Sequence, residues 1–518
     1  MILRTKAVTA FLLAGVVAAT AFSQTGTPAP AASATPGAPS APPVPAVPLG
    51  VAMVANSADS ITLAWYRAPN NDAKVYTVYS SATKDGTFTR VADVTERTST
   101  IKKLSPGTTY YFKVAAAYAH GVSAQSPAVQ GFTITPVAGA DFPVRIARNM
   151  CVSLGATLVS SSVPKVGKLS DLVDGSDATS CGIEGATEVK IKLNTTTPIG
   201  DAAYLMLNFR SDNSGKGHAY NINWRALKDY VITESHDSTD GSDGTWKEIA
   251  SGSNKYLDGV VVIPNNKPKW IGVRNSGSFQ LCRLDVFRAA PAGFRNDYWI
   301  FAGDSLIVQD ISGGSPDGQG VKFADLVRQQ HPDRYPMVVN SSQGGEVIAN
   351  TLARLKNSLP VQAAPNGTAV PTGTILCLET GFNDIGVGGG LWMGPKFIQS
   401  LTEAQELCKS HGIFLVPVRI EYSNGYLNKE TLEPNKYNVF YNTLAVNLAG
   451  VDVFARTHAP YACDPKTQMP YADYWTYTRE NHATALAKDG VHHTKEGSDG
   501  INRLWASVAD KMIYAKQR

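Results

Sequence analysis

The sequence carries little charge and no concentrated basic block. Only 17% of the 518 residues are charged, and the formal net charge is +4. Proteins that grip the phosphate backbone of nucleic acids need a dense Lys/Arg surface, so nucleic acid is not expected as a partner. After the N-terminal segment, no apolar run reaches the ~18 residues that a membrane helix requires. We therefore expect no membrane span.

The sequence also lacks the common metal-binding patterns. It contains no Cys-x-x-Cys pair and no His-Glu-x-x-His, so neither a metal ion nor another cofactor is expected. Six cysteines in an exported protein permit disulfides, but their connectivity is left open by the sequence. Cys151 and Cys282 lie near the two ends of one candidate domain and could join these ends by a disulfide. Four remain unassigned, of which Cys377 fits a buried strand as a small core side chain: Cys181, Cys377, Cys408 and Cys463.

The N-terminus has the pattern of a secretory signal peptide. Arg4 and Lys6 precede the apolar residues 7–21, and the small residues Ala21 and Ser23 suit a cleavage site. We expect a signal peptide over residues 1–23 and a secreted or periplasmic protein. Residues 24–48 are mostly Ala, Pro, Ser, Thr and Gly, a composition that forms an extended linker rather than a core.

Residues 49–137 alternate short strand-like runs with turn residues, as in a small all-β sandwich. Trp65 lies in one such run, and Leu104, Pro106, Gly107 and Tyr110 form a turn leading into another. These features resemble a fibronectin type III domain. The resemblance implies a sandwich built around Trp65 that serves as a spacer.

Residues 140–291 form a second β-rich region. An Asp174-Gly175 turn comes early, a strand-like run follows Trp246, and cysteines lie near both ends. The region resembles the discoidin-like (coagulation factor type C) galactose-binding domains, which are all-β jelly rolls. The resemblance leaves two roles open, which are sugar binding and packing against the following domain.

Residues 294–518 alternate apolar strands with amphipathic segments of helical length, which indicates an α/β fold with a parallel sheet. We expect helices over 321–330, 347–359, 397–410 and 434–448, and strands that include 413–420 and 451–455. A final helix from Lys495 should pack on the sheet through one apolar stripe: Ile501, Leu504, Trp505, Val508 and Met512.

This α/β region contains a serine, a histidine and an aspartate in a pattern that suggests nucleophilic catalysis. Gly303-Asp304-Ser305 follows the apolar run 298–302, and Asp489 precedes His492 by three residues near the C-terminus. A Ser hydroxyl becomes a nucleophile when a neighbouring base takes its proton, and a third group must orient that base. Ser305, His492 and Asp489 can supply these three roles.

Two further polar loops follow strand-like runs, at the strand ends where open parallel sheets bind ligands. The run 337–340 leads to Gly344 and Gly345, and the run 374–379 leads to Gly381-Phe382-Asn383-Asp384. A glycine lets a backbone N–H approach a reacting oxygen, and an Asn side chain donates a second hydrogen bond. With the Ser305 N–H, such donors would form an oxyanion hole.

These blocks resemble the SGNH, or GDSL-type, hydrolases, whose Ser, Gly, Asn and His occur in this order. The resemblance covers residues 294–518 and implies a three-layer α/β hydrolase with Ser305, His492 and Asp489 as the triad. It implies an oxyanion hole of Ser305, Gly345 and Asn383. Gly344 is a neighbouring alternative to Gly345, and His493 is a neighbouring alternative to His492. Leu306-Ile307-Val308 departs from the family's longer first block and would make the wall beside the nucleophile apolar.

The domain combination favours a secreted carboxylic ester hydrolase that removes O-acetyl groups from a polysaccharide. Loop aromatics could stack on sugar rings, and the candidates are Trp392, Tyr422 and Trp475. The apolar residues 306–308 also permit a lipase, thioesterase or arylesterase. A non-catalytic carbohydrate-binding surface protein is the alternative outside the enzymes.

Overall fold

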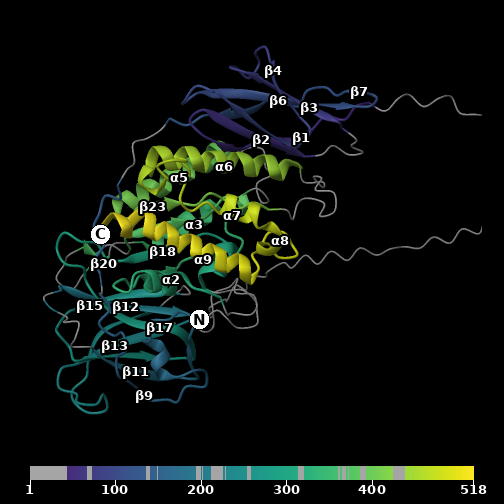
Figure 1. Cartoon of the computed structure of the whole chain (residues 1–518). Coiled ribbons are helices and arrows are strands. Elements are labelled where there is room, and N and C mark those ends of the chain that lie inside the picture. Colours follow the sequence, from purple (N-terminus) through teal and green to yellow (C-terminus); the bar gives the residue numbers. More distant parts are fainter. Residues whose placement is uncertain are drawn as a thin grey trace, which may run out of the picture. The chain divides into compact units, whose positions relative to one another are not determined.

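The computed structural model describes the following residues: 44–66, 73–135, 141–148, 150–193, 200, 202–211, 226–227, 229–253, 258–312, 320–359, 362–363, 369–370, 373–384, 393–423 and 438–517. The expected signal peptide and nearly all of the expected linker lie outside these ranges. The chain divides into a unit of Met1–Val44 and a compact unit of Pro45–Arg518, and only the second is described below (Figure 1).

The first part of the compact unit is an antiparallel β-sandwich. One sheet has the order β1-β2-β5, and the other has the order β4-β3-β6-β7, with β8 also paired to β6. Trp65 is buried in the core that the two sheets share. The Tyr110 hydroxyl accepts a hydrogen bond from Ser105 N–H at 2.9 Å and so fixes the turn before β6. The strands are β1 Leu49–Asn56, β2 Ser60–Tyr66, β3 Val75–Ser81, β4 Thr89–Val94, β5 Thr98–Lys102, β6 Thr109–Tyr118, β7 Gly121–Val122 and β8 Val129–Phe132.

The second part is also built from two antiparallel sheets, with the orders β10-β17-β12-β15 and β14-β13-β16-β11-β9. Because side chains alternate along a strand, Leu205, Leu207 and Phe209 of β12 enter the core of this region, whereas Asn208 and Arg210 face the α/β part. The elements are β9 Leu158–Ser160, η1 Leu169–Leu172, β10 Cys181–Ile183, β11 Thr187–Lys192, β12 Tyr204–Ser211, β13 Asp229–Ser235, β14 Lys247–Ser253, β15 Gly259–Pro264, β16 Trp270–Asn275 and β17 Phe279–Arg288.

The third part is an α/β region around a parallel sheet of order β19-β18-β22-β23. Its strands are β18 Tyr298–Ala302, β19 Met337–Asn340, β22 Ile375–Leu378 and β23 Phe414–Pro417; β20 Gln362–Ala363 and β21 Ala369–Val370 form a separate small pair. Such strands are buried on both faces and read as continuous apolar runs, as Tyr298–Ala302 does.

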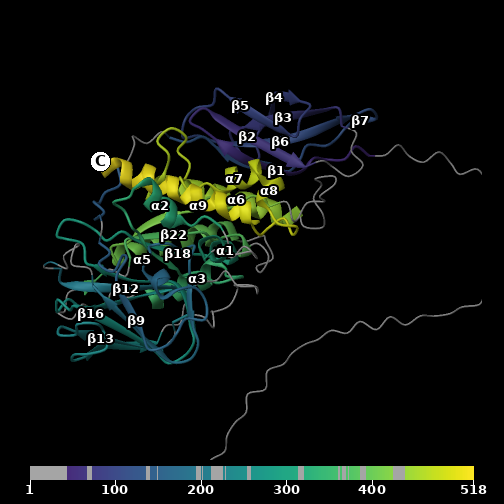
Figure 2. The ribbon, with the colours of Figure 1, turned by 60° about the horizontal axis from the view of Figure 1, so that its bottom comes forward.

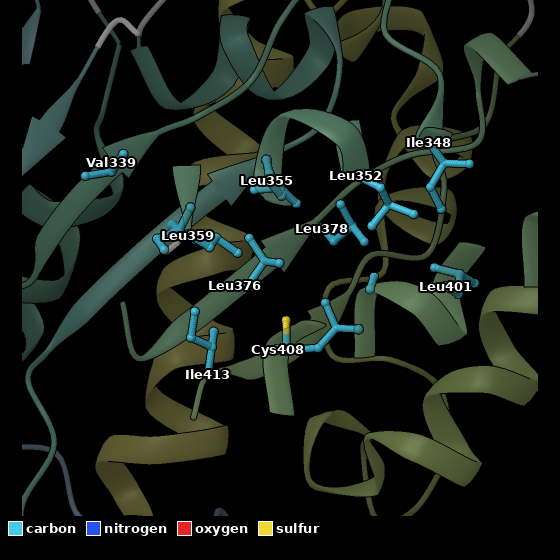
Figure 3. Close-up of a cluster of buried hydrophobic side chains, with 14 of the residues drawn as sticks. Val339, Ile348, Leu352, Leu355, Leu359, Leu376, Leu378, Leu401, Cys408 and Ile413 are labelled. Atoms are coloured by element: carbon cyan, nitrogen blue, oxygen red, sulfur yellow. The ribbon is translucent and has the colours of Figure 1, made fainter. Parts of the chain in front are cut away.

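Helices cover both faces of this sheet, since alternate strand residues belong to two separate cores. Trp299 and Phe301 pack with α1 Ser305–Ser312, α2 Phe323–Gln330 and α9 Lys495–Ala509, and α2 lies beside α9 (Figure 2). Leu376 and Leu378 pack with α3 Ile348–Ser358, α5 Met393–Ser410 and α6 Asn438–His458; Figure 3 shows this core around Leu355 and Cys408. The remaining elements are η2 Pro460–Ala462, α7 Tyr474–Glu480, α8 His482–Ala485, η3 Asp510–Tyr514 and η4 Ala515–Gln517.

The observed helices follow the sequence pattern except at one segment. The expected helices over 321–330, 347–359 and 397–410 are α2, α3 and α5. The apolar stripe expected after Lys495 runs over α9 and, with Met512, η3, and it is buried apart from the half-buried Leu504. The expected strand over 451–455 is wrong, because these residues continue α6 to His458. Leu448, Val451 and Ala455 recur at helical spacing and are buried together with Phe454. A window of five residues was too short to reveal that period.

The edge strand β19 is covered by side chains of the second β region. Asn208 Nδ2 donates to Val338 O at 3.2 Å, and Arg283 Nη2 donates to Pro336 O at 3.2 Å. Asp258 Oδ2 accepts from Asn340 N–H at 2.8 Å. Backbone groups of alternate residues point to the same side of a strand, so these side chains pair three successive outward positions that an exposed edge would leave open.

Charged residues at this junction are buried and paired with one another. Arg210 lies 3.1 Å from Asp177 and 3.5 Å from Asp258, and its Nη2 donates to Ile311 O near the end of α1 at 3.0 Å. Arg283 pairs with Asp177 at 3.2 Å and with Asp285 at 2.7 Å. The two arginines also donate to Ile311 O and Pro336 O of the α/β part. The second β region is therefore packed against the α/β part.

Cys151 and Cys282 do not form the expected disulfide. All six lie in the described part of the chain, where each is a buried thiol and none is in a disulfide. Cys151 Sγ lies 3.5 Å from Ser153 Oγ, whereas Cys282 Sγ contacts Arg210 O at 3.6 Å. Cys377 is a core side chain of β22, as the sequence predicts. None of the described helices is long and apolar enough to cross a membrane.

Candidate active site

The turn between β18 and α1 positions Ser305. Gly303 approaches the backbone of β22 so closely that an added Cβ would lie 2.2 Å from Glu379 O, which explains the glycine at this position. Asp304 Oδ1 accepts from Leu306 N–H at 3.0 Å and caps α1. Ser305 is the first residue of the helix, where a backbone N–H has no intrahelical acceptor. The Ser305 N–H thus has no acceptor within the helix, and none of the hydrogen bonds between described backbone groups uses it.

Ser305, His492 and Asp489 form a hydrogen-bonded chain. Ser305 Oγ lies 3.0 Å from His492 Nε2, and His492 Nδ1 lies 2.7 Å from Asp489 Oδ2. Asp489 Oδ1 also accepts from the N–H groups of Val491 and His492, each at 3.0 Å. Although partial burial opposes it, the hydrogen bonds from His492 and Val491 lower the pKa of Asp489. This geometry suits a base that takes a proton from Ser305 and a carboxylate that orients the base.

The neighbouring histidine has a different environment. His493 is buried, and its Nδ1 lies 3.0 Å from both oxygens of Asp310. Ser498 Oγ donates to the same carboxylate at 2.7 Å. Of the two adjacent histidines, His492 is therefore the one that reaches Ser305.

The loop after β19 presents Gly345. Gly345 is exposed and has φ +75°, and an added Cβ would meet nothing within 4 Å. None of the hydrogen bonds between described backbone groups uses its N–H. Gly344 does not share the left-handed conformation. A side chain at position 345 would thus point into open space.

Asn383 is held by the residue that precedes the serine. Its Nδ2 donates to Asp304 Oδ2 at 2.8 Å and to Glu346 O at 3.2 Å. An amide nitrogen has two hydrogens, and both hydrogens of Nδ2 are already used. Asn383 can therefore donate to a substrate oxygen only if its longer hydrogen bond, to Glu346 O, breaks. Asp304 is 1% exposed. Asp304 thus links the loops that follow β18 and β22.

Sequence reasoning missed a second set of residues that fixes these loops. Arg354 on α3 donates to Glu346 at 2.9 and 2.6 Å, and to Ser341 Oγ at 2.8 Å. Asp384 accepts at 3.1 Å from Ile348 N–H, the first N–H of α3, which has no acceptor within the helix. Two sequence features could have indicated these contacts. They are the acidic Glu346 directly after Gly345 and the Asn383-Asp384 pair. These bonds hold the Gly345 loop against α3.

The expected substrate-binding aromatics are not equivalent. Trp392 lies outside the described residues. Trp475 is 1% exposed, so its ring does not offer the stacking face expected from the sequence. Tyr422 is half-buried, with its ring edge-on to Trp475 at 5.5 Å. The next residue, Ser423, donates to Gly490 O at 2.7 Å, which places Tyr422 beside the turn that carries His492.

The expected apolar wall beside the nucleophile is also absent at residues 306–308. Leu306, Ile307 and Val308 are at most 1% exposed, because α1 turns them into the protein interior. Among the described residues, no group of three or more His, Cys, Asp or Glu side chains is arranged to hold a metal ion.

Comparisons with known proteins concern the first β-sandwich. A family model, "Fibronectin type III domain", matches residues 46–132. Among solved structures, a fourth FNIII domain from human is 20% identical over 21% of this chain and 94% of its own, with a TM-score of 0.18. A human fibronectin type-III domain is 24% identical over 19% and 93%, with a TM-score of 0.17. An Fn3-like protein from Clostridium thermocellum is 27% identical over 18% and 98%, also at 0.17. No curated protein matches the chain. Residues 46–132 are a fibronectin type III domain, followed by a region of further β-sheets and an α/β region with a parallel sheet.

Proposed function

We propose that the protein is a secreted serine esterase of the SGNH/GDSL type that removes O-acetyl groups from a polysaccharide. The observation that carries the proposal is the Ser305–His492–Asp489 chain, with bonds of 3.0 and 2.7 Å, at the carboxyl end of a parallel sheet. Asn383 and Gly345 follow the two strands that flank β18. The second β region would be the discoidin-like jelly roll.

In the first half-reaction, Ser305 Oγ attacks the ester carbonyl while His492 Nε2 takes its proton. Asp489 stabilises the imidazolium that forms. The Ser305 and Gly345 N–H groups and the Asn383 amide would donate to the developing oxyanion. His492 then gives the proton to the leaving sugar oxygen, the C–O bond of the ester breaks, and acetyl-Ser305 remains.

In the second half-reaction, a water molecule replaces the sugar alcohol. His492 takes a proton from the water as its oxygen attacks the acetyl carbon, and the same donors hold the oxyanion. Return of the proton to Ser305 Oγ releases acetate. The described chain can supply every proton transfer without a cofactor.

Two features support a small acyl group on a large substrate. The side chains of His492 and Asp489 are 29% and 49% exposed, so a bulky polymer can approach them. The burial of Leu306, Ile307 and Val308 removes the apolar wall that had favoured a lipase, thioesterase or arylesterase. The N-terminal sequence supports secretion or a periplasmic location, where polysaccharides are accessible.

The test compares hydrolysis of p-nitrophenyl acetate and p-nitrophenyl octanoate, followed by acetate release from acetylated xylan and pectin. Ser305→Ala should abolish turnover, whereas Ser410→Ala, at an exposed serine on α5, should not. A preference for octanoate would favour the lipase alternative. Absence of Ser305-dependent turnover on every ester would favour the non-catalytic carbohydrate-binding alternative.

A further inference from the structure

Three carboxyl groups lie in a row beneath the nucleophile. Asp304 precedes Ser305, Glu379 follows β22, and Glu421 lies shortly after β23. All three are at most 1% exposed. The strands that precede them, β18, β22 and β23, are neighbours in the sheet, and a Cβ built on Gly303, next to Asp304, would lie 3.1 Å from Glu379 Oε2. The row therefore runs across neighbouring strands at the same carboxyl edge of the sheet as Ser305.

Such a row cannot be fully ionised. A carboxylate only accepts hydrogen bonds, so a bond between two carboxyl groups requires a proton on one of them. No donor on a described residue meets hydrogen-bond geometry at the four side-chain oxygens of Glu379 and Glu421. Burying a carboxylate that receives no hydrogen bond is costly, so Glu379 and Glu421, both 0% exposed, are expected to be protonated, and one negative charge remains. Asp304 is the member that accepts from Asn383 Nδ2 and Leu306 N–H, so the charge belongs there.

We propose that Glu379 and Glu421 are positioning residues that stay protonated at neutral pH and hold Asp304 as the single carboxylate that orients Asn383. Glu379 donates its proton to Asp304, and a neutral Glu421 places no second charge near Glu379. Loss of the Glu379 proton would place two negative charges side by side and displace Asp304 from Asn383. The consequence for catalysis rests on the proposed esterase function, whereas the protonation itself does not.

The electrostatic surroundings agree with this assignment. Burial, followed by the charges of Asp304 and Glu421, raises the pKa of Glu379 well above its usual range. Burial, followed by the charge of Asp304, raises the pKa of Glu421 in the same direction. Burial raises the pKa of Asp304 to about 6, against the lowering effects of Leu306 N–H, Glu379 and His492. The charged or titratable groups that face the row from packed elements are Asp310, Asp384, His492 and Tyr474.

The kinetic test uses the full chain and follows kcat for p-nitrophenyl acetate from pH 5 to 10. Glu379→Leu removes the donor to Asp304, and we expect kcat at pH 7 to fall about ten-fold or more, the factor for one lost hydrogen bond to a charged group. Glu379→Gln keeps a neutral donor of the same shape, so it should restore most of kcat and remove the alkaline decline of the wild type. Asp297→Asn is the matched control, because Asp297 is also a buried carboxyl of raised pKa but lies before β18, at the opposite end of the strand. It should leave the pH profile unchanged.

Infrared spectroscopy tests the protonation without any substrate. At pH 7 the wild-type-minus-Glu379→Gln difference spectrum should contain the C=O band of a protonated carboxylic acid, and Glu421→Gln should remove a second one. Carboxylate bands in place of these acid bands would overturn the proposal. An alkaline decline that persists in Glu379→Gln would overturn the positioning role. If the wild type hydrolyses no ester, the proposed function fails, while the infrared result still decides the protonation.

Discussion

Replacement of Asp258 by alanine should destabilise the junction between the second β region and the α/β part. Asp258 is 2% exposed, and it accepts from Ser211 N–H at 2.9 Å and from Asn340 N–H at 2.8 Å. The substitution removes this acceptor from both N–H groups. It also removes one of the two carboxylates beside Arg210, although Asp177 remains at 3.1 Å.

The magnitude follows from these contacts. Two buried N–H groups that lose their acceptor cost about 1–3 kcal/mol each, or about 2–6 kcal/mol together. Burial raises the pKa of Asp258 even against the charge of Arg210, so burying this carboxylate destabilises the folded state. Its removal therefore offsets part of the lost free energy of unfolding. We expect a net loss of about 2–5 kcal/mol for Asp258→Ala. Asp258→Asn keeps one oxygen acceptor and should lose less.

The assay is urea unfolding of the full chain, followed by tryptophan fluorescence and by far-UV circular dichroism. Because a multidomain chain need not unfold in one step, the transition shared by the β region and the α/β part is the one compared. Asp333→Ala is the control, since its pair with Arg148 is exposed and should contribute less than about 1 kcal/mol. A change below about 1 kcal/mol for Asp258→Ala would refute the reasoning, since the two acceptor bonds alone predict more.

Further predictions concern the site. Asn383→Ala should lower kcat on p-nitrophenyl acetate by about 100-fold, the usual effect of losing one oxyanion donor, and unchanged turnover would exclude that role. Gly303→Ala should reduce the yield of folded protein, measured by circular dichroism, because its Cβ would lie 2.2 Å from Glu379 O. The pKa of Asp489 is lowered by its bonds to His492 and Val491, against partial burial, so its contribution to stability is present above the unfolded pKa and is lost as pH falls through the folded one. The melting temperature of Asp489→Asn should therefore fall less than that of the wild type on acidification, and parallel curves would contradict the shift.

Local sequence patterns predicted what depends on local chemistry. A continuous apolar run, a glycine and a polar residue suffice to indicate a strand end, so the loops of Ser305 and Asn383 could be placed at the same edge of the sheet. The sequence could not separate His492 from His493, because adjacent residues share every local signal. Their difference arises from Asp310, which lies 183 residues from His493 in the sequence.

The failures have the same cause. Trp475 and the thiols of Cys151 and Cys282 are surrounded by segments that are distant in the sequence. The spacing of apolar residues within a segment does not indicate burial by such distant segments. The contact of Asn208 with Val338 spans 130 residues, and the sequence around either residue gives no sign of it. The strand expected over 451–455 failed because five residues fit both a buried strand and a buried turn of helix.

The six buried thiols make the chain its own set of folding reporters. A thiol reacts with a modifying reagent only when it becomes accessible and ionised. Cys282 is buried, and burial raises the pKa of the other five thiols. Three thiols lie in or beside the second β region, and the others lie in β22, α5 and the loop after η2. Mass spectrometry after a pulse of thiol labelling would thus show in which order these regions become accessible during unfolding, without any engineered cysteine. The native chain can also be refolded under reductant, since no bond between its cysteines has to form.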